Sequence, residues 1–141
     1  GFANHPQWNE SLQPIAQLKT KIIQIHDIKL GETVGYNSGW KASKNTRIAI
    51  LPIGHADGFS RQYGNGKGWV LINGIKAPVV GNVCMDMVMV ELTDLQIAPG
   101  EEAVLIGPEQ SASAMAKDAG TISYEILTGL GARIPRLYLQ D

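Results

Sequence analysis

The sequence predicts a mainly β fold, a closed or partly open Greek-key β-barrel with two short helices near the C-terminus. Short apolar runs rich in Val and Ile recur along the first two thirds of the chain, and runs of this kind favour strands. Clusters of Gly, Asn and Asp separate the runs, as tight turns require. Many short strands with turns between them indicate a sheet that closes on itself, because closure removes unpaired edges. The last third contains an Ala-rich stretch, which favours helix.

Length and composition indicate one globular domain with a real core. The chain has 141 residues, of which 44% are hydrophobic and 18% are charged, and this balance is too apolar for a disordered chain. The formal charge is −1 and no block of Lys and Arg occurs. We therefore expect no nucleic-acid partner and no patch for a membrane surface.

The cysteine count and the lack of long apolar segments bear on location. Cys84 is the only cysteine, which excludes an intramolecular disulfide and a four-cysteine metal centre within one chain, and we expect no metal site. The sequence shows no signal-peptide pattern and no apolar run long enough to cross a bilayer. We expect a cytoplasmic protein.

The first elements form the N-terminal part of the expected sheet. Residues 1–14 have neither strand nor helix periodicity, so we expect a linker that joins this chain to a preceding part of a longer protein. Residues 17–28 are rich in Ile and alternate in part, which predicts one strand. Tyr36 lies between Gly35 and Asn37, which predicts a tight turn that carries an aromatic side chain.

The central strands come next. Residues 46–53 predict a strong strand with Pro52 near its end, where no ladder hydrogen bond is needed. Residues 69–72 and 75–80 predict a hairpin, because the Asn-Gly pair at 73–74 is a strong turn signal between apolar runs.

The C-terminal part mixes strands with helices. Residues 83–92 predict a well-buried strand whose methionines belong to the core, and residues 102–107 predict a short strand. Residues 111–119 are Ala-rich and are followed by Gly120, which predicts a short helix.

A second helix and a final strand complete the prediction. Thr121 is expected to cap a helix over residues 122–130, which Gly131 ends. Residues 133–139 predict a last strand, and Pro135 places it at an edge or a bulge.

Two strand cores each run into a polar, glycine-flanked segment, and these segments are the candidate site. They read Gly-His-Ala-Asp-Gly-Phe-Ser-Arg at 54–61 and Gly-Asn-Val-Cys-Met-Asp at 81–86. A strand that ends in glycine-flanked His, Asp and Arg is typical of a rigid scaffold that presents side chains from a loop. The same glycines also fit ordinary turns whose polar side chains face water. The pattern alone leaves both interpretations open.

Two tyrosines are further candidates. Glycine beside Tyr36 allows its hydroxyl to be aimed at a ligand, although a tyrosine on a turn also serves as a surface anchor. Tyr124 falls in the first turn of the second predicted helix, where a hydroxyl and unpaired N–H groups suit a phosphate or a carboxylate. The alternative for Tyr124 is a buried ring with one satisfied hydrogen bond.

Taken together, five segments resemble the C-terminal domain of bacterial alanine racemase, in the same order and at matching spacings, over almost the whole chain. They read V-G-Y, L-P-I-G-H-A-D-G-F-S-R, A-P-V-V-G-N-V-C-M-D, G-T-I-S-Y-E-I-L and R-I-P-R-L-Y. In their residues, the five segments most resemble racemases that are fused to a cell-wall ligase, an enzyme that adds D-alanyl-D-alanine to a muramoyl tripeptide.

The resemblance implies a pyridoxal-phosphate enzyme that interconverts L-alanine and D-alanine for peptidoglycan. It implies that residues 1–14 are a linker from an N-terminal (β/α)₈ barrel that carries the Schiff-base lysine. Residues 15–141 are then a β-domain that completes the active site of the partner subunit in a homodimer. The chain alone is expected to be inactive.

The resemblance also assigns roles to single residues. Tyr36 is the second catalytic base, and Tyr124 binds the cofactor phosphate. The residues expected at the substrate or at its entrance are Met85 and Asp86 for substrate binding, and His55, Arg61 and Ile122 for the entrance. Two positions depart from the family pattern, because many members have a tyrosine at His55 and an arginine at Asn82. At His55 an imidazole replaces the phenol of the family pattern, and Asn82 deprives Arg61 of its usual neighbour.

The chemistry is consistent with a tyrosine base. Racemisation removes the Cα proton on one face and replaces it on the other, so two bases must flank a planar carbanion. A tyrosine has a reference pKa of about 10, so Tyr36 needs cationic neighbours, which the barrel would supply. The alternatives are a related pyridoxal-phosphate decarboxylase, a serine racemase, or a non-enzymatic β-barrel binding module. The last would need an exposed aromatic groove, and only 6% of the residues are aromatic.

Overall fold

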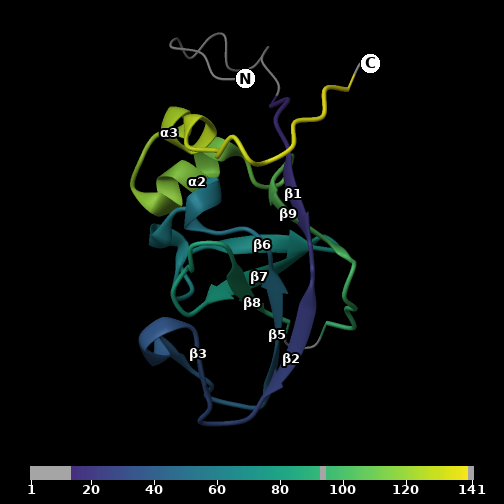
Figure 1. The fold of residues 1–141 in the computed structure, drawn as a ribbon, viewed down its shortest axis with the longest axis vertical. Helices are drawn as coiled ribbons and strands as arrows, with labels where there is room; N and C mark the ends of the chain where they lie inside the picture. Colours follow the sequence, from purple (N-terminus) through teal and green to yellow (C-terminus); the bar gives the residue numbers. More distant parts are fainter. Residues whose placement is uncertain (1–13, 93–94, 140–141) are drawn as a thin grey trace.

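The structure, a computed structural model, describes residues 14–92 and 95–139. They form one curled antiparallel sheet of seven strands and a small two-stranded ribbon (Figure 1). The sheet contains β1 (Leu18–Lys21), β2 (Gln24–Ile28), β5 (Thr46–Leu51), β6 (Trp69–Ile72), β7 (Ile75–Val80), β8 (Val88–Glu91) and β9 (Glu102–Ile106). The ribbon is β3 (Thr33–Val34) and β4 (Trp40–Lys41). The helices are α2 (Ala112–Ala119) and α3 (Ser123–Thr128), with 3₁₀ turns η1 (Tyr36–Ser38), η2 (His55–Asp57) and η3 (Arg61–Tyr63).

The sheet has Greek-key topology and is nearly closed. Its strand order is β1-β9-β6-β7-β8-β5-β2, so β6, β7 and β8 form a meander and β5 returns to pair with β8. The two edge strands, β1 and β2, are consecutive in the chain, and only Ile22 and Ile23 separate them. The prediction of a mainly β fold, a closed or partly open Greek-key barrel with two short helices near the C-terminus, is confirmed, and the sheet is of the partly open kind.

The predicted single strand over residues 17–28 was wrong, because the chain changes pairing partners in its middle. The Ile22 N–H donates to Glu101 O at 2.9 Å, whereas the next N–H, of Ile23, donates to Ile50 O at 3.0 Å. Successive amides in a strand point to opposite sides. The bend therefore lets one continuous segment pair with β9 on one side and β5 on the other, which brings the two ends of the sheet together.

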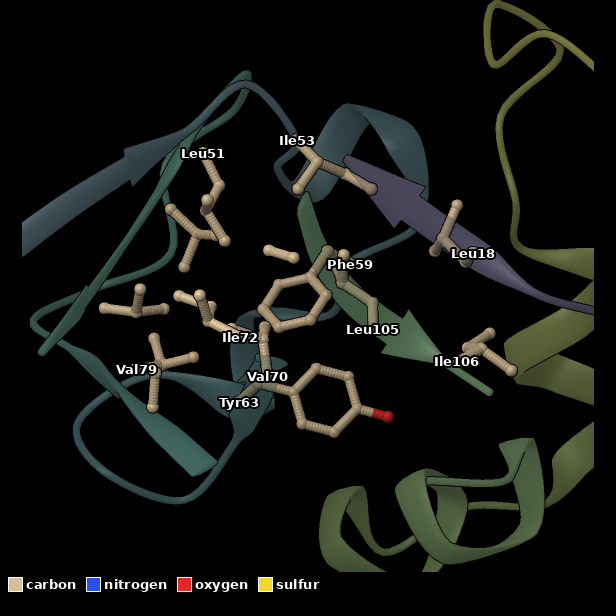
Figure 2. Packing of buried hydrophobic residues seen from close by; sticks show 14 of the residues in the cluster. Leu18, Leu51, Ile53, Phe59, Tyr63, Val70, Ile72, Val79, Leu105 and Ile106 are labelled. Carbon is tan, nitrogen blue, oxygen red and sulfur yellow. The ribbon is translucent and has the colours of Figure 1, made fainter. Parts of the chain in front are cut away.

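The core fills the inside of the curled sheet and extends under the helices. Figure 2 shows Phe59 and Tyr63 among aliphatic side chains such as Val70 and Leu105, and all four are buried. The Tyr63 hydroxyl points toward the helices and donates to the carbonyl of Met115 at 3.0 Å. Burial, and to a lesser extent the charge of Asp118, raises the pKa of Tyr63 to about 12. This buried hydrogen bond ties α2 to the barrel.

Local signals predicted the hairpin between β6 and β7 and the helix α2 correctly, but not the start and length of the second helix. Asn73 and Gly74 have φ values of 50° and 75°, the left-handed pair that a tight type I′ hairpin requires. The Ser111 hydroxyl accepts from the Ala114 N–H at 3.2 Å, and Gly120 ends α2 with a φ of 68°. The second helix is shorter than predicted. It spans Ser123–Thr128 with its N-cap at the residue before Ser123, because the hydroxyl of Thr121, the predicted cap, bonds to Glu125 instead.

The predicted strand over residues 83–92 begins only at Val88. Before it the chain turns, and the Cys84 N–H donates to Met87 O at 3.1 Å. Met85 and Met87 are therefore 53% and 41% exposed, and they do not belong to the core as predicted. This turn places both methionines on the surface that forms the candidate site.

The predicted strand over residues 133–139 does not form. Instead, this part of the chain bonds to itself, because the guanidinium of Arg136 donates to the carbonyls of Gly131, Ile134 and Leu130. In the described part of the chain, no helix is long and apolar enough to cross a membrane. Residues 1–13, which hold nearly all of the predicted linker, lie outside the described residues.

Candidate active site

A groove of about 450 Å³ lies where β2, β5, the Tyr36 turn and the segment after β7 meet. Tyr36, Met85 and Asp86 all line it. The rest of its wall is mainly apolar and includes Ile48 and Met89. The fold thus brings the predicted base and the predicted substrate-binding residues together from distant parts of the sequence.

The Tyr36 turn has an unusual backbone. Gly35 has a φ of 80°, and the non-glycine residues Asn37 and Ser38 have φ values of 55° and 50°. Left-handed backbone is uncommon outside glycine, although Asn adopts it more readily than most residues. The Tyr36 side chain is 66% exposed, and the carbonyl of Tyr36 accepts from the Gly39 N–H at 3.1 Å. The chain therefore presents the phenol on a short, tightly wound turn.

The two polar segments singled out in the sequence form one unit. The N–H groups of His55 and Ala56 donate to the carbonyls of Cys84 and Met85, each at 2.9 Å. Gly54 lies so close to this segment that a Cβ on it would lie 2.5 Å from Cys84 O and 2.6 Å from Met85 O. The two segments therefore support each other and form one continuous surface.

Arg133 joins this unit to the C-terminal part of the chain. Its Nε lies 2.6 Å from Asp57 Oδ1, and its Nη2 lies 2.6 Å from Asp86 Oδ1. Asp57 is only 6% exposed and also accepts from the Gly54 N–H at 2.8 Å. Burial raises the pKa of Asp57, but the bonds from Arg133 and Gly54 outweigh it, so the pKa is lowered. The hydrogen bonds to Asp57 and Asp86 raise the pKa of Arg133, so the guanidinium stays charged.

We expect Arg133→Met to make the protein less stable in acid. An ionised Asp57 with a lowered pKa stabilises the fold above its unfolded pKa, and this stabilisation disappears as the pH falls through the folded pKa. Without the guanidinium, the carboxylate of Asp57 keeps the bond from the Gly54 N–H but loses those from Arg133. Burial then disfavours its charged form more strongly, so the pKa of the carboxyl rises. The midpoint of acid unfolding, followed by circular dichroism, should move to higher pH. Lys19→Met is the matched control, because the Lys19–Glu102 pair lies on an exposed part of the surface. An unchanged midpoint for Arg133→Met would contradict the inferred role of the pair.

The other predicted site residues do not line the groove. His55 and Arg61 are exposed on η2 and η3. Tyr124 is 50% exposed and Ile122 is 59% exposed, at the start of α3. In Figure 1, α3 lies at the top of the molecule and β3, which precedes the Tyr36 turn, lies at the bottom. Tyr36 and Tyr124 are therefore at opposite ends of this domain and do not meet within one copy of it.

Sequence reasoning missed two side chains of this region. His26 lines the groove from β2, where it is opposite Ile48 in the strand register. A period-two pattern on residues 24–28 would have placed His26 and Ile28 on one face, as both line the groove. Arg133 was assigned only to a strand, because a partner 76 residues away in the sequence leaves no local signal.

The family model for the alanine racemase C-terminal domain matches residues 15–138. The chain belongs to this family. Among curated alanine racemases, that of Clostridium kluyveri is 42% identical over 137 residues, which is 94% of this chain and 35% of that protein. That of Carboxydothermus hydrogenoformans is 43% identical over 133 residues, or 91% of this chain and 36% of that protein. The chain thus spans about a third of the length of the curated relatives it matches.

Solved alanine racemases share the fold. The Bacillus anthracis enzyme with bound L-Ala-P has a TM-score of 0.90 at 32% identity, and the match covers 100% of this chain and 38% of that one. The Bartonella henselae enzyme with covalently bound pyridoxal phosphate has a TM-score of 0.83 at 38% identity, with 87% of this chain and 34% of that one covered. The expected domain fold of the racemase family is confirmed.

Proposed function

We propose that this chain is the C-terminal domain of a pyridoxal-phosphate-dependent alanine racemase, in which it completes the active site of a partner subunit. The observation that carries the proposal is the groove that brings Tyr36 beside Met85 and Asp86. The similarity to alanine racemases, including one solved with bound L-Ala-P, supports the choice of alanine.

The side chains of the groove fit a role beside the cofactor but not the covalent attachment of it. Attachment as a Schiff base needs a lysine amine, and no lysine lines the groove among the described residues. The groove instead offers one phenol within a mainly apolar wall. The lysine would therefore come from the barrel domain. When bound, the cofactor withdraws electrons from the substrate and makes its Cα hydrogen acidic.

Each residue of the groove then has a defined task. Tyr36, acting as a phenolate, would accept the Cα proton of L-alanine on one face of the substrate, and the resulting phenol would return it in the reverse reaction. The Met85 carbonyl is held by the Ala56 N–H, whereas the Met85 N–H donates no hydrogen bond to another described residue. This N–H suits the substrate carboxylate. Asp86 and its pair with Arg133 fix the backbone on which Met85 lies.

The distance between the two tyrosines supports a dimer. Tyr124, with an exposed hydroxyl-bearing ring at the start of α3, would donate to the cofactor phosphate. Because β3, which leads into the Tyr36 turn, lies at the other end of the domain from α3 (Figure 1), the two tyrosines would serve two different active sites. In a symmetric homodimer each domain then contributes to both sites.

The test is turnover by the complete protein that contains this chain. We expect it, loaded with pyridoxal phosphate, to form D-alanine from L-alanine, to act more slowly on L-serine, and to release no CO₂ from L-lysine. The 141-residue chain alone should form no D-alanine. Chiral chromatography measures the racemisation, and trapped ¹⁴CO₂ measures decarboxylation. Release of CO₂ without racemisation would identify a decarboxylase, and faster turnover of serine would identify a serine racemase. Turnover by the chain alone would refute the assignment of the lysine to the barrel.

A further inference from the structure

We propose that Asn82 is a positioning residue that fixes the Tyr36 turn and thereby the direction of the phenol. The inference rests on the proposed function, because it gives Asn82 a role through the base. Its strongest support is a direct contact. Asn82 Nδ2 donates to the main-chain carbonyl of Tyr36 at 3.0 Å, although the two residues are 46 positions apart in the sequence.

The whole amide of Asn82 is used, in a single orientation. The Tyr36 carbonyl can only accept a hydrogen bond, so the nitrogen of the Asn82 amide must face it. On the other side, Asn82 Oδ1 accepts from Asn65 Nδ2 at 3.1 Å. Neither an aspartate nor a flipped amide satisfies both neighbours. The side chain therefore acts as a bridge between the Tyr36 turn and the glycine-rich loop that holds Asn65.

The Tyr36 turn needs a support of this kind. Three of its residues, Gly35, Asn37 and Ser38, have a positive φ. For a residue other than glycine, such a backbone conformation is unfavourable and persists only where the surroundings hold it. Among the described residues, Asn82 is the one whose side chain bonds to the backbone of η1. The exposed Tyr36 turn, with its unfavourable backbone, thus depends on the hydrogen bond that Asn82 donates to it from another part of the chain.

Asn82 is itself anchored on a rigid part of the fold. It follows β7 and Gly81, and the Gly81 carbonyl accepts from the Asn65 N–H at 2.8 Å. A Cβ on Gly81 would lie 3.0 Å from the carbonyl of Val34. The strand end is therefore packed directly against the chain that leads into the Tyr36 turn. Because Asn82 lies on this rigid strand end, its hydrogen bond holds the Tyr36 turn in one position. A side chain on a mobile loop would not do so.

Gly39 provides a second, independent observation of the same contact. A Cβ on Gly39 would lie 2.6 Å from Asn82 Nδ2 and 3.1 Å from Asn82 Cγ. The φ of Gly39 is −63°, which any residue adopts, so the backbone does not require glycine here. The space beside Gly39 is occupied mainly by the Asn82 amide, and the Tyr36 carbonyl oxygen lies 3.1 Å from the same Cβ position. Gly39→Ala should therefore displace the amide without straining its own backbone.

The consequence for catalysis concerns kcat more than KM. A misplacement of about 1 Å at a reacting group can lower a rate by about 100-fold. Asn82→Ala leaves the Tyr36 hydroxyl and the Met85 backbone in the protein, but it removes the bridge. We expect kcat for L-alanine to fall by about 10–100-fold, with KM changed by less than about threefold.

The experiment compares four variants of the complete, cofactor-loaded enzyme. Asn82→Ala removes the bridge, Asn82→Asp keeps its shape but lacks the donor, and Gly39→Ala displaces the amide. Asn45→Ala is the matched control, because Asn45 also holds a loop, by accepting from the Leu30 N–H at 2.9 Å, and it does not line the groove. Each is measured for kcat and KM, alone and combined with Tyr36→Phe. Hydrogen exchange of residues 35–41 is followed by mass spectrometry.

The proposal expects the first three variants to lower kcat and to quicken exchange in residues 35–41, while Asn45→Ala does neither. In the Tyr36→Phe background, Asn82→Ala should lower the remaining rate by less than about twofold, because its effect acts through the missing hydroxyl. A full, additive loss in that background overturns the proposal, as does unchanged kcat or unchanged exchange in Asn82→Ala. If Tyr36→Phe itself retains full activity, the role of Tyr36 in the proposed function fails. Exchange in Asn82→Ala then still decides whether the bridge holds the turn.

Discussion

Tyr36→Phe is expected to lower racemisation by the complete enzyme by about 10²–10⁴-fold in both directions, the usual contribution of a general base. The substitution removes only the hydroxyl and keeps the ring. Because Tyr36 is 66% exposed, the fold should stay intact. Both directions slow because each needs a base on both faces of the substrate. The initial rates of D-alanine and L-alanine formation measure the loss.

Exchange of the Cα hydrogen with D₂O separates the roles of the two bases. If Tyr36 acts on L-alanine and the barrel lysine acts on D-alanine, Tyr36→Phe should abolish most exchange from L-alanine and preserve exchange from D-alanine. Mixed dimers of Tyr36→Phe subunits and subunits without the lysine should regain part of the activity, because the two groups would come from different subunits. Dead mixed dimers of folded parents would count against this arrangement.

Tyr138→Phe is the control for loss of a tyrosine hydroxyl. Tyr138 is 91% exposed and does not line the groove. Its change should leave racemisation within about twofold of the wild type, as is usual for substitutions away from a site. Equal losses from the two substitutions would show that Tyr36 has no special role as a base.

Gly54→Ala is expected to lower the free energy of unfolding by about 1–3 kcal/mol, the usual cost of overpacking. The added Cβ would lie 2.5 Å from Cys84 O, 2.6 Å from Met85 O and 2.7 Å from Asp86 N. All three are backbone atoms, so no side-chain rotation relieves the conflict. Gly54 has a φ of −149°, so the backbone itself accepts alanine and the effect comes from the contacts.

The same substitution should weaken substrate binding, because it pushes the Met85 backbone away from β5 and η2. We expect KM for alanine to rise several-fold. The loss of stability is measured by urea unfolding. Gly107→Ala is the control, since a Cβ there would meet one side-chain atom of Val104 at 2.9 Å, which can move. If Gly107→Ala destabilises the protein as much as Gly54→Ala, the close backbone approach is not the cause.

Some elements were determined by the sequence alone, because their signals lie within a few residues. Asn73 and Gly74 accept left-handed backbone, so the hairpin between β6 and β7 follows from the two residues themselves. Ser111 and Gly120 bound α2 in the same local way. The five family segments likewise identified the domain, because their order and spacing are properties of the sequence.

Other features were decided only by tertiary structure. Whether residues 17–28 form one strand or two depends on two partners, β9 and β5, that come much later in the chain. The turn before β8 exposes Met85, which its apolar sequence had assigned to the core.

The candidate site shows the same division. The sequence identified Tyr36 and the Cys-Met-Asp segment, but not the contacts that place them. Arg133 reaches Asp57 and Asp86 across 76 and 47 residues, and Asn82 reaches Tyr36 across 46. Contacts at such separations leave no periodicity in a single sequence, because they depend on how the sheet curls and which strand ends then meet. The sequence therefore identified the candidate site residues, whereas the side chains that hold them in place became known only from the fold.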